Sequence, residues 1–130
     1  MPEKPLFIRH VGMRLQVQPG GRCTCTLAVQ DLHLNGNGVV HGGVLFTLAD
    51  TAMGAALHHT LEEGQLCATI ETKIAYFKPV FEGEVVCHGQ ILHQGKSVAS
   101  TEASLYVDDV LVAKATGSFA IFKRKTAAPS

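Results

Sequence analysis

The segment from His41 to His59 limits the possible folds of this chain more than any other. It lacks the alternation of a half-buried strand, and its apolar residues fall on all sides of a helix. These residues are Val44, Leu45, Phe46, Leu48, Ala49, Ala52, Met53, Ala55, Ala56 and Leu57. A helix that is apolar all round is stable only when it is buried, so we expect the rest of the chain to cover most of it.

The part of the chain before this helix has the pattern of a hairpin. Apolar and polar residues alternate over 11–18 and again over 22–30, and Pro19-Gly20-Gly21 forms a turn between them. Residues 31–40 are loop-like, because Asn and Gly in this segment favour unusual backbone angles.

The part after the helix has the pattern of a sheet. Four further strands are predicted, at 67–77, 84–93, 98–107 and 110–122. Two strands, a buried helix and about four more strands indicate an α+β domain whose sheet curls around the helix. We expect one domain over 1–130, with a frayed tail at about 124–130.

The composition argues against several classes of partner. Eleven basic residues balance eleven acidic ones, so no global field draws the chain to nucleic acid or to an anionic membrane. The N-terminus is too polar for a signal peptide and no apolar run could span a bilayer, so we expect a cytoplasmic protein. Only 17% of the residues are charged, which indicates that other subunits cover part of the surface.

Cysteine and histidine spacing points to no metal or disulfide. The four cysteines form no CxxC pair, and Cys23 and Cys25 alternate with threonines on one face of a strand. In a reducing compartment this pattern is typical of small buried side chains with free thiols. The seven histidines lack a metal-ligand spacing, so no bound metal is expected.

Asp50 is the strongest anomaly in the chain, because it places a carboxylate within the apolar helix. Thr47, Gly54 and His58 share its side of the helix, with Thr51 adjoining, and form a narrow polar stripe. Such a stripe can line a cleft that uses the carboxylate for catalysis. The alternative is a structural Asp50 that accepts local hydrogen bonds or pairs with a lysine.

The start of the helix, His41-Gly42-Gly43, is the second candidate feature. The first turn of a helix offers unpaired N–H groups and a positive dipole end, and glycines let a ligand approach them. This arrangement suits the stabilisation of a developing oxyanion. A glycine-rich helix start required by packing alone is the alternative.

The pattern Asn35-Gly-Asn-Gly-Val-Val-His41-Gly-Gly, followed by Leu45-Phe-Thr-Leu-Ala-Asp50-Thr-Ala, closely resembles the hotdog-fold thioesterases. The likeness is to the phenylacetate-pathway branch of the 4-hydroxybenzoyl-CoA thioesterase superfamily, and it covers nearly the whole chain. Tyr76-Phe-Lys-Pro and Gln94-Gly-Lys match two further motifs of these proteins.

The resemblance implies an acyl-CoA thioesterase with no cofactor beyond the coenzyme A of its substrate. It implies dimers, or dimers of dimers, with active sites at the subunit interface. Asp50 matches the general base or nucleophile, and Gly42 the backbone donor to the thioester carbonyl. Asn35 and His41 match residues that position the carbonyl or a water, and Thr69 falls where relatives have a serine or threonine. Because Asp is shorter than the Glu of some relatives, both direct attack and activation of a water remain open.

Substrate contacts are expected at several further positions. These are Gly43, Thr51, Lys78, Gly95, Lys96 and Ser97, and Lys73 is a further candidate cation for the anionic coenzyme A. Two other functions stay open. A hotdog enoyl-thioester hydratase or dehydratase would pair His41 with Asp50, although its His-Phe-Pro-Gly loop is missing, and a non-catalytic acyl-CoA-binding protein would bind without turnover.

Overall fold

Residues 6–125 are described by the computed structural model, and they form one antiparallel sheet wrapped around one long helix. The elements in chain order are α1 (Leu6–Val11), β1 (Arg14–Gln18), β2 (Arg22–Ala28), the 3-10 helix η1 (Asp31–His33), α2 (Gly42–His58), β3 (Gln65–Tyr76), β4 (Glu84–Gln94), β5 (Val98–Val107) and β6 (Val110–Lys123). The predicted α+β class is therefore confirmed, and five of the six predicted strands lie within two residues of their expected bounds.

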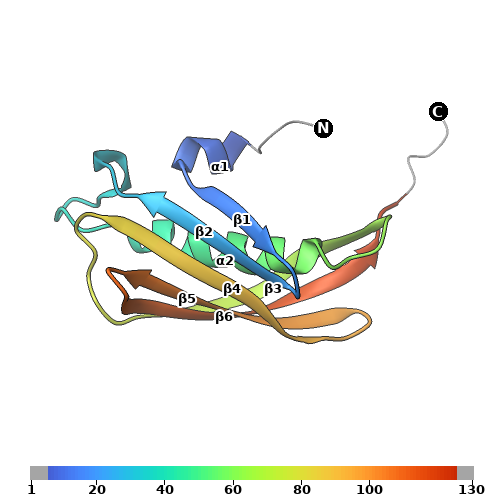
Figure 1. Ribbon diagram of the computed structural model, residues 1–130. Helices are drawn as coiled ribbons and strands as arrows, with labels where there is room; N and C mark the ends of the chain where they lie inside the picture. Colours follow the sequence, from blue (N-terminus) through green and yellow to red (C-terminus); the bar gives the residue numbers. More distant parts are fainter. Residues whose placement is uncertain (1–5, 126–130) are drawn as a thin grey trace.

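The strand order across the sheet is β1-β2-β4-β5-β6-β3, and every neighbouring pair is antiparallel. β3 follows α2 in the chain but pairs with β6, so it closes the far edge of the sheet. The sheet curls so that its inner face lies against α2 along the length of the helix (Figure 1). Both ends of the strand order, β1 and β3, are edges.

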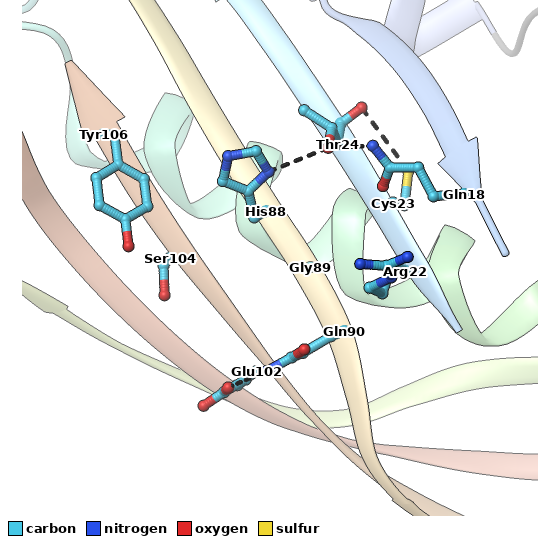
Figure 2. Close-up of a pocket in the computed structure, with 10 residues that line it drawn as sticks. All are labelled: Gln18, Arg22, Cys23, Thr24, His88, Gly89, Gln90, Glu102, Ser104 and Tyr106. Atoms are coloured by element: carbon cyan, nitrogen blue, oxygen red, sulfur yellow. Dashed lines mark hydrogen bonds between the residues drawn. The ribbon is translucent and has the colours of Figure 1, made fainter. Parts of the chain in front are cut away.

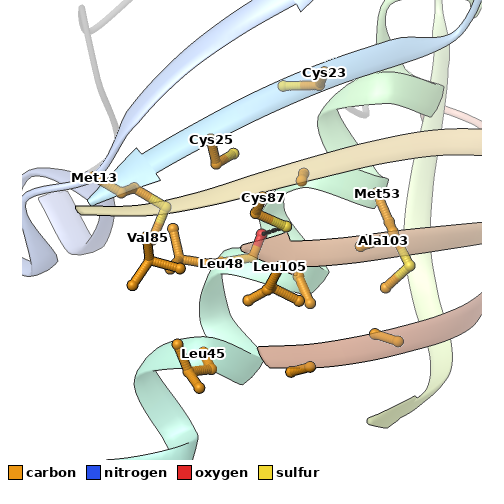
Figure 3. Close-up of a cluster of buried hydrophobic side chains, with 14 of the residues drawn as sticks. Met13, Cys23, Cys25, Leu45, Leu48, Met53, Val85, Cys87, Ala103 and Leu105 are labelled. Atoms are coloured by element: carbon orange, nitrogen blue, oxygen red, sulfur yellow. Dashed lines mark hydrogen bonds between the residues drawn. The ribbon is translucent and has the colours of Figure 1, made fainter. Parts of the chain in front are cut away.

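The core lies between α2 and the inner face of the sheet. Leu48, Met53 and Leu57 of α2 are fully buried, as are Cys25 and Cys87, which are direct partners across β2 and β4. Figure 3 shows cysteine and methionine side chains filling the layer between sheet and helix. The cysteines are free thiols, and three of the four are fully buried as small apolar side chains.

Helix and sheet approach so closely at one point that only glycine fits. A Cβ at Gly89 of β4 would lie 2.7 Å from the backbone carbon of Ala52 and 2.8 Å from its oxygen. The pair Gly89–Ala52 thus sets the spacing between β4 and the middle of α2. This contact sets how closely α2, which carries Asp50, packs against β4.

Three sequence expectations need correction. The chain before β1 is the helix α1 and not the start of a strand, so Val11 ends a helix and β1 begins at Arg14 after the turn at Gly12. Helix α2 is buried on one side only within this chain, because Phe46, Asp50 and His58 are partly or fully exposed. Residue 124, where a frayed tail was expected to begin, is held in place, because β6 extends to Lys123 and the Arg124 N–H donates to the Gly64 carbonyl. The rest of the predicted tail, residues 126–130, lies outside the described range.

The outer face of the sheet carries a separate polar network. The Gln18 amide donates to the Thr24 hydroxyl, which also contacts His88 Nδ1, and Gln90 donates to the Glu102 carboxylate (Figure 2). These side chains line a depression of about 490 Å³. They alternate along their strands with the buried residues of the inner face, so the sheet separates them from α2 and Asp50.

Candidate active site

Asp50 lies near the middle of α2, on the side of the helix that β3 faces. Its side chain is half-buried, and Oδ1 accepts hydrogen bonds from the Thr69 hydroxyl at 2.8 Å and the Thr72 hydroxyl at 3.3 Å. Within residues 6–125, the Asp50 Oδ2 atom has no hydrogen-bond partner and no cation lies within ion-pair distance of the carboxylate. Of the two structural alternatives for Asp50, local hydrogen bonds are present and a lysine partner is absent within the described residues, and one carboxylate oxygen is left without a protein partner.

A β-bulge explains how both threonines reach Asp50. Side chains three apart in a regular strand point to opposite faces. The register of β3 against β6 shifts between Thr69 and Glu71, with Ile70 as the extra residue. The bulge reverses the alternation, so Thr69 before it and Thr72 after it both face the helix.

Strand β3 runs antiparallel to α2 and contacts the helix along much of its length. Before the bulge, the Cys67 thiol approaches the Gly54 carbonyl at 3.9 Å, and after it the Tyr76 hydroxyl donates to the Gly42 carbonyl at 2.7 Å. Burial raises the pKa of the Cys67 thiol, and the nearby charge of Asp50 adds to this effect. Cys67 therefore remains a neutral thiol beside Asp50 and is a poor nucleophile.

His41 caps the start of α2 with two groups. Its Nδ1 atom accepts a hydrogen bond from the Gly43 N–H at 2.8 Å, and its carbonyl accepts one from the Val44 N–H at 2.9 Å. Because a backbone N–H is always a donor, Nδ1 carries the lone pair, and a neutral His41 ring holds its proton on Nε2. Within residues 6–125, the Gly42 N–H is left without a partner. Gly42, and not Gly43, therefore offers the free donor at the helix start.

Tyr76 was not among the residues predicted to form the site, although its motif was recognised. A Cβ at Gly42 would lie 3.1 Å from the Tyr76 oxygen and 3.2 Å from its Cζ, so the tyrosine ring occupies the space beside this glycine. Burial raises the pKa of the Tyr76 hydroxyl, which therefore stays protonated and acts as a donor. Thr72 was also missed, because only the bulge turns it towards Asp50.

A small cavity of about 310 Å³ adjoins the helix start. It lies between Gly42, Leu45 and the loop after β3, and its walls are mostly apolar. The remaining lining residues are Val39, Val40, Tyr76, Phe77, Lys78, Pro79 and Val80. Lys78, one of the expected cations, thus lines the same cavity as Gly42.

Asn35 shapes the loop that leads into α2. Its Oδ1 atom accepts hydrogen bonds from the N–H groups of Asn37 at 2.8 Å and Val39 at 3.2 Å. The loop is closed by the bridge between Leu34 and Val40. The side-chain amide oxygen of Asn35 is therefore used within the loop, and its side-chain NH₂ group is the one left to bind a ligand.

Other predicted substrate contacts are not brought to the helix start within this chain. The turn Gly95–Ser97 joins β4 to β5 near the C-terminal end of α2, where Thr60 donates to Gln94 at 3.0 Å (Figure 1). Gly42 lies at the opposite end of a helix of 17 residues, about 25 Å long. Thr51 is half-buried and makes no side-chain hydrogen bond within the described residues, and Lys73 is exposed on β3.

No group of three or more His, Cys, Asp or Glu side chains within residues 6–125 could hold a metal ion. The same residues contain no helix that is long and apolar enough to cross a membrane. Within residues 6–125 the candidate groups are therefore the Asp50 carboxylate with one unpaired oxygen, the unpaired Gly42 N–H at the start of α2, and the cavity that Gly42 lines.

Comparisons with known proteins point to one family. The family described as the thioesterase superfamily matches residues 37–114. Human acyl-coenzyme A thioesterase 13 is 35% identical over 86 residues, which span 65% of this chain but only 61% of that protein. The structure of the conserved protein PA5202 from Pseudomonas aeruginosa is 34% identical, has a TM-score of 0.87 and aligns with 92% of this chain and 95% of its own.

The phenylacetate branch is represented by a variant of the phenylacetic acid degradation protein PaaI from Thermus thermophilus. It aligns with 89% of this chain and 98% of its own at a TM-score of 0.82, with 22% identity, which is a likeness in fold. The family match covers the helix start, Asp50 and all of β3, β4 and β5. The chain therefore belongs to the thioesterase superfamily and has the hotdog fold of that family.

Proposed function

We propose that the protein hydrolyses acyl-CoA thioesters to a free acid and coenzyme A. The observation that carries this proposal is Asp50, whose Oδ1 accepts from Thr69 and Thr72 while Oδ2 has no partner in the described part of the chain. The unpaired Gly42 N–H at the start of the same helix supplies the complementary donor. The name of the human relative, an acyl-coenzyme A thioesterase, supports the same substrate class.

The proposed chemistry needs only these two groups and water. Asp50 Oδ2 removes a proton from a water that attacks the thioester carbon, or attacks that carbon itself to form an anhydride that water then cleaves. The Gly42 N–H donates to the carbonyl oxygen as it becomes an oxyanion, and the thiolate of coenzyme A leaves. A general base contributes about 10²–10⁴-fold and an oxyanion donor about 10²–10³-fold, which suits an ester with a good leaving group.

Two subunits are required for these groups to meet at one carbonyl. Gly42 and Asp50 are eight residues apart, about 12 Å along the axis of α2. The N–H groups of a helix point towards its N-terminus, so the Gly42 donor points away from Asp50 of the same chain. We therefore propose that Asp50 works opposite the Gly42 of a second copy.

The edge strand β3 is the surface for this contact. It has a partner only on the β6 side, and its exposed Ile70 is 56% accessible. A long unpaired edge with an apolar residue tends to pair with another chain. Pairing of β3 with β3 of a second copy gives a dimer, and dimers of dimers can follow. Analytical ultracentrifugation measures which assembly forms.

Substrate contacts complete the proposal. Lys78 lies beside the helix-start cavity and suits the anionic coenzyme A, while Asn35 NH₂ and His41 Nε2 are the donors that can orient the carbonyl or the water. Across the subunit boundary, the remaining contacts come from the helix and from the β4–β5 turn. The contacts that accompany Asp50 are Thr51, Gly95, Lys96 and Ser97, whereas Gly43 lies beside Gly42 on the other side of the boundary.

The test is thiol release from aryl-, short-, medium- and long-chain acyl-CoAs by wild-type protein and by Asp50→Asn. The asparagine keeps an oxygen for the threonine hydroxyls but no base, so kcat should fall about 10²–10⁴-fold while the fold and acyl-CoA binding persist. Asp109→Asn is the matched control. Asp109 lies in the β5–β6 turn at φ 62°, a backbone angle that asparagine also tolerates.

Each result decides between the functions considered. Binding of acyl-CoA without thiol release from any substrate would show a non-catalytic binding protein. Hydration of an enoyl-CoA without thiol release would show a hydratase. Equal kcat for Asp50→Asn and wild type would refute the role of Asp50 while leaving the activity itself established.

A further inference from the structure

We propose that Tyr76 is a positioning residue that, together with His41, holds the peptide between Gly42 and Gly43 so that the Gly42 N–H faces the thioester oxygen. This inference rests on the proposed role of Gly42 and adds a residue to it. We call this arrangement the peptide clamp; it consists of the Tyr76 hydroxyl, the His41 ring and the peptide they hold.

The clamp hydrogen-bonds both polar groups of one peptide, its C=O and its N–H. The Tyr76 hydroxyl donates to the Gly42 carbonyl oxygen at 2.7 Å, and the N–H of the same peptide, which belongs to Gly43, donates to His41 Nδ1 at 2.8 Å. Rotation of this peptide plane would break both hydrogen bonds. The Gly42 N–H lies in the preceding peptide, between His41 and Gly42, and the Gly43–His41 hydrogen bond closes a ring that includes this peptide. The clamp therefore restrains the Gly42 N–H as well. The two anchors come from different elements, because Tyr76 ends β3 and His41 precedes α2.

Two consecutive glycines make such a clamp necessary. Glycine has more backbone freedom than any other residue, so a Gly-Gly helix start samples conformations in which the N–H is misaligned. Catalysis by a hydrogen-bond donor depends on its being held in place before the reaction. The glycine at 42 leaves Tyr76 its place in the clamp, since a Cβ there would lie 3.1 Å from the Tyr76 oxygen and 3.2 Å from its Cζ, and the tyrosine would have to shift.

The position of Tyr76 depends on the bulge in β3. Tyr76 and Thr69 are seven residues apart, so a regular strand would place them on opposite faces. The register shift between Thr69 and Glu71 brings both to the helix side. Strand β3 therefore contacts both groups that this chain supplies to the proposed reaction. Thr69 binds Asp50, and Tyr76 binds the peptide between Gly42 and Gly43.

The experiment compares Tyr76→Phe with Tyr106→Phe. Both changes delete one phenolic oxygen, but Tyr106 lies on the outer face of the sheet and its hydroxyl makes no hydrogen bond within the described residues. A neutral hydrogen bond is worth about a 2- to 12-fold effect. We expect Tyr76→Phe to lower kcat by about 3- to 12-fold with KM within twofold, and Tyr106→Phe to match wild type.

Two further measurements separate positioning from general stability. In a Gly42→Pro background the N–H is absent, so adding Tyr76→Phe should leave kcat unchanged, whereas a structural effect would lower it again. Amide hydrogen exchange without substrate should show faster exchange of the Gly43 N–H in Tyr76→Phe than in Tyr106→Phe, because the clamp has lost one of its two anchors.

The proposal is overturned if Tyr76→Phe keeps the wild-type kcat, if its effect persists in the Gly42→Pro background, or if Gly43 exchange is the same in both tyrosine variants. A wild-type protein that hydrolyses no acyl-CoA refutes the proposed function instead. In that case the comparison of Gly43 N–H exchange between the two tyrosine variants still decides whether Tyr76 holds the peptide between Gly42 and Gly43.

Discussion

Replacement of Gly42 by proline removes one backbone N–H while the backbone at the start of α2 can keep its conformation. Gly42 is the first residue of the helix, the position at which proline is best tolerated. The residue before a proline must be extended, and His41 already has φ −59° and ψ 134°. The deleted N–H has no partner within residues 6–125, so no protein hydrogen bond is lost.

The matched control is Gly42→Ala, which keeps the N–H. Alanine and proline both add a Cβ, which would lie 3.1 Å from the Tyr76 oxygen. Tyr76 is 49% exposed and can move by the few tenths of an ångström that this contact requires. The strain is common to both variants, so their difference isolates the donor. We expect their thermal midpoints to agree within about 4 °C, equivalent to about 1 kcal/mol for a domain of this size.

The expected difference in turnover is large. Loss of one oxyanion donor lowers kcat by about 10²–10³, or about 2.7–4 kcal/mol of transition-state stabilisation. The other N–H groups of the first turn cannot compensate, because His41 already accepts from those of Gly43 and Val44. KM should change less than kcat, since the donor acts on charge that develops only in the transition state.

The assay is steady-state thiol release at saturating acyl-CoA, with binding of a non-hydrolysable thioether analogue measured in parallel. We expect both variants to bind the analogue and only Gly42→Ala to turn over substrate at a substantial rate. A Gly42→Pro enzyme with kcat within fivefold of Gly42→Ala would refute the assignment of this N–H as the oxyanion donor.

Two further predictions concern the support of the site. Thr69→Val should lower kcat by about tenfold or more, and Thr72→Val by less, because Thr69 donates to Asp50 at 2.8 Å and Thr72 at 3.3 Å. Equal losses of kcat in thiol-release assays would contradict this order. Gly89→Ala should lower the free energy of unfolding by about 1–3 kcal/mol or more, because its Cβ would overlap the Ala52 backbone. Urea denaturation measures this loss against Gly36→Ala, where an added Cβ meets nothing within 4 Å, and equal midpoints would contradict it.

The parts of the fold that could be predicted from the sequence are those with local chemical markers. Pro19-Gly20-Gly21 and Asp108-Asp109 are turn sequences, and the structure has tight turns at both, with φ values of 49° and 62° at the two aspartates. The strands that these turns join were predicted within a few residues. Helix α1 was missed because its six residues lack an acidic first turn and bury no side chain.

The site was predicted only where a residue type was unusual for its place. Asp50 stands out within an apolar helix, and the two glycines stand out at its start. Thr72 and Tyr76 do not stand out, because their approach to α2 depends on a bulge that no residue in the segment marks. The predicted low-dielectric surroundings of Asp50 were only partly correct, since the side chain is half-buried within one chain.

The bulge at Ile70 limits how the length of β3 can vary in related proteins. Deletion of this residue would restore regular alternation and turn Thr72 and Tyr76 away from the helix together. Insertion of one further residue downstream would have the same consequence for every position that follows it. The segment from Cys67 to Tyr76 can therefore accept many substitutions of side chain but very few changes in residue count. Gaps in alignments of this family belong in the hairpin turns, where an added residue leaves the orientation of β3 towards α2 unchanged.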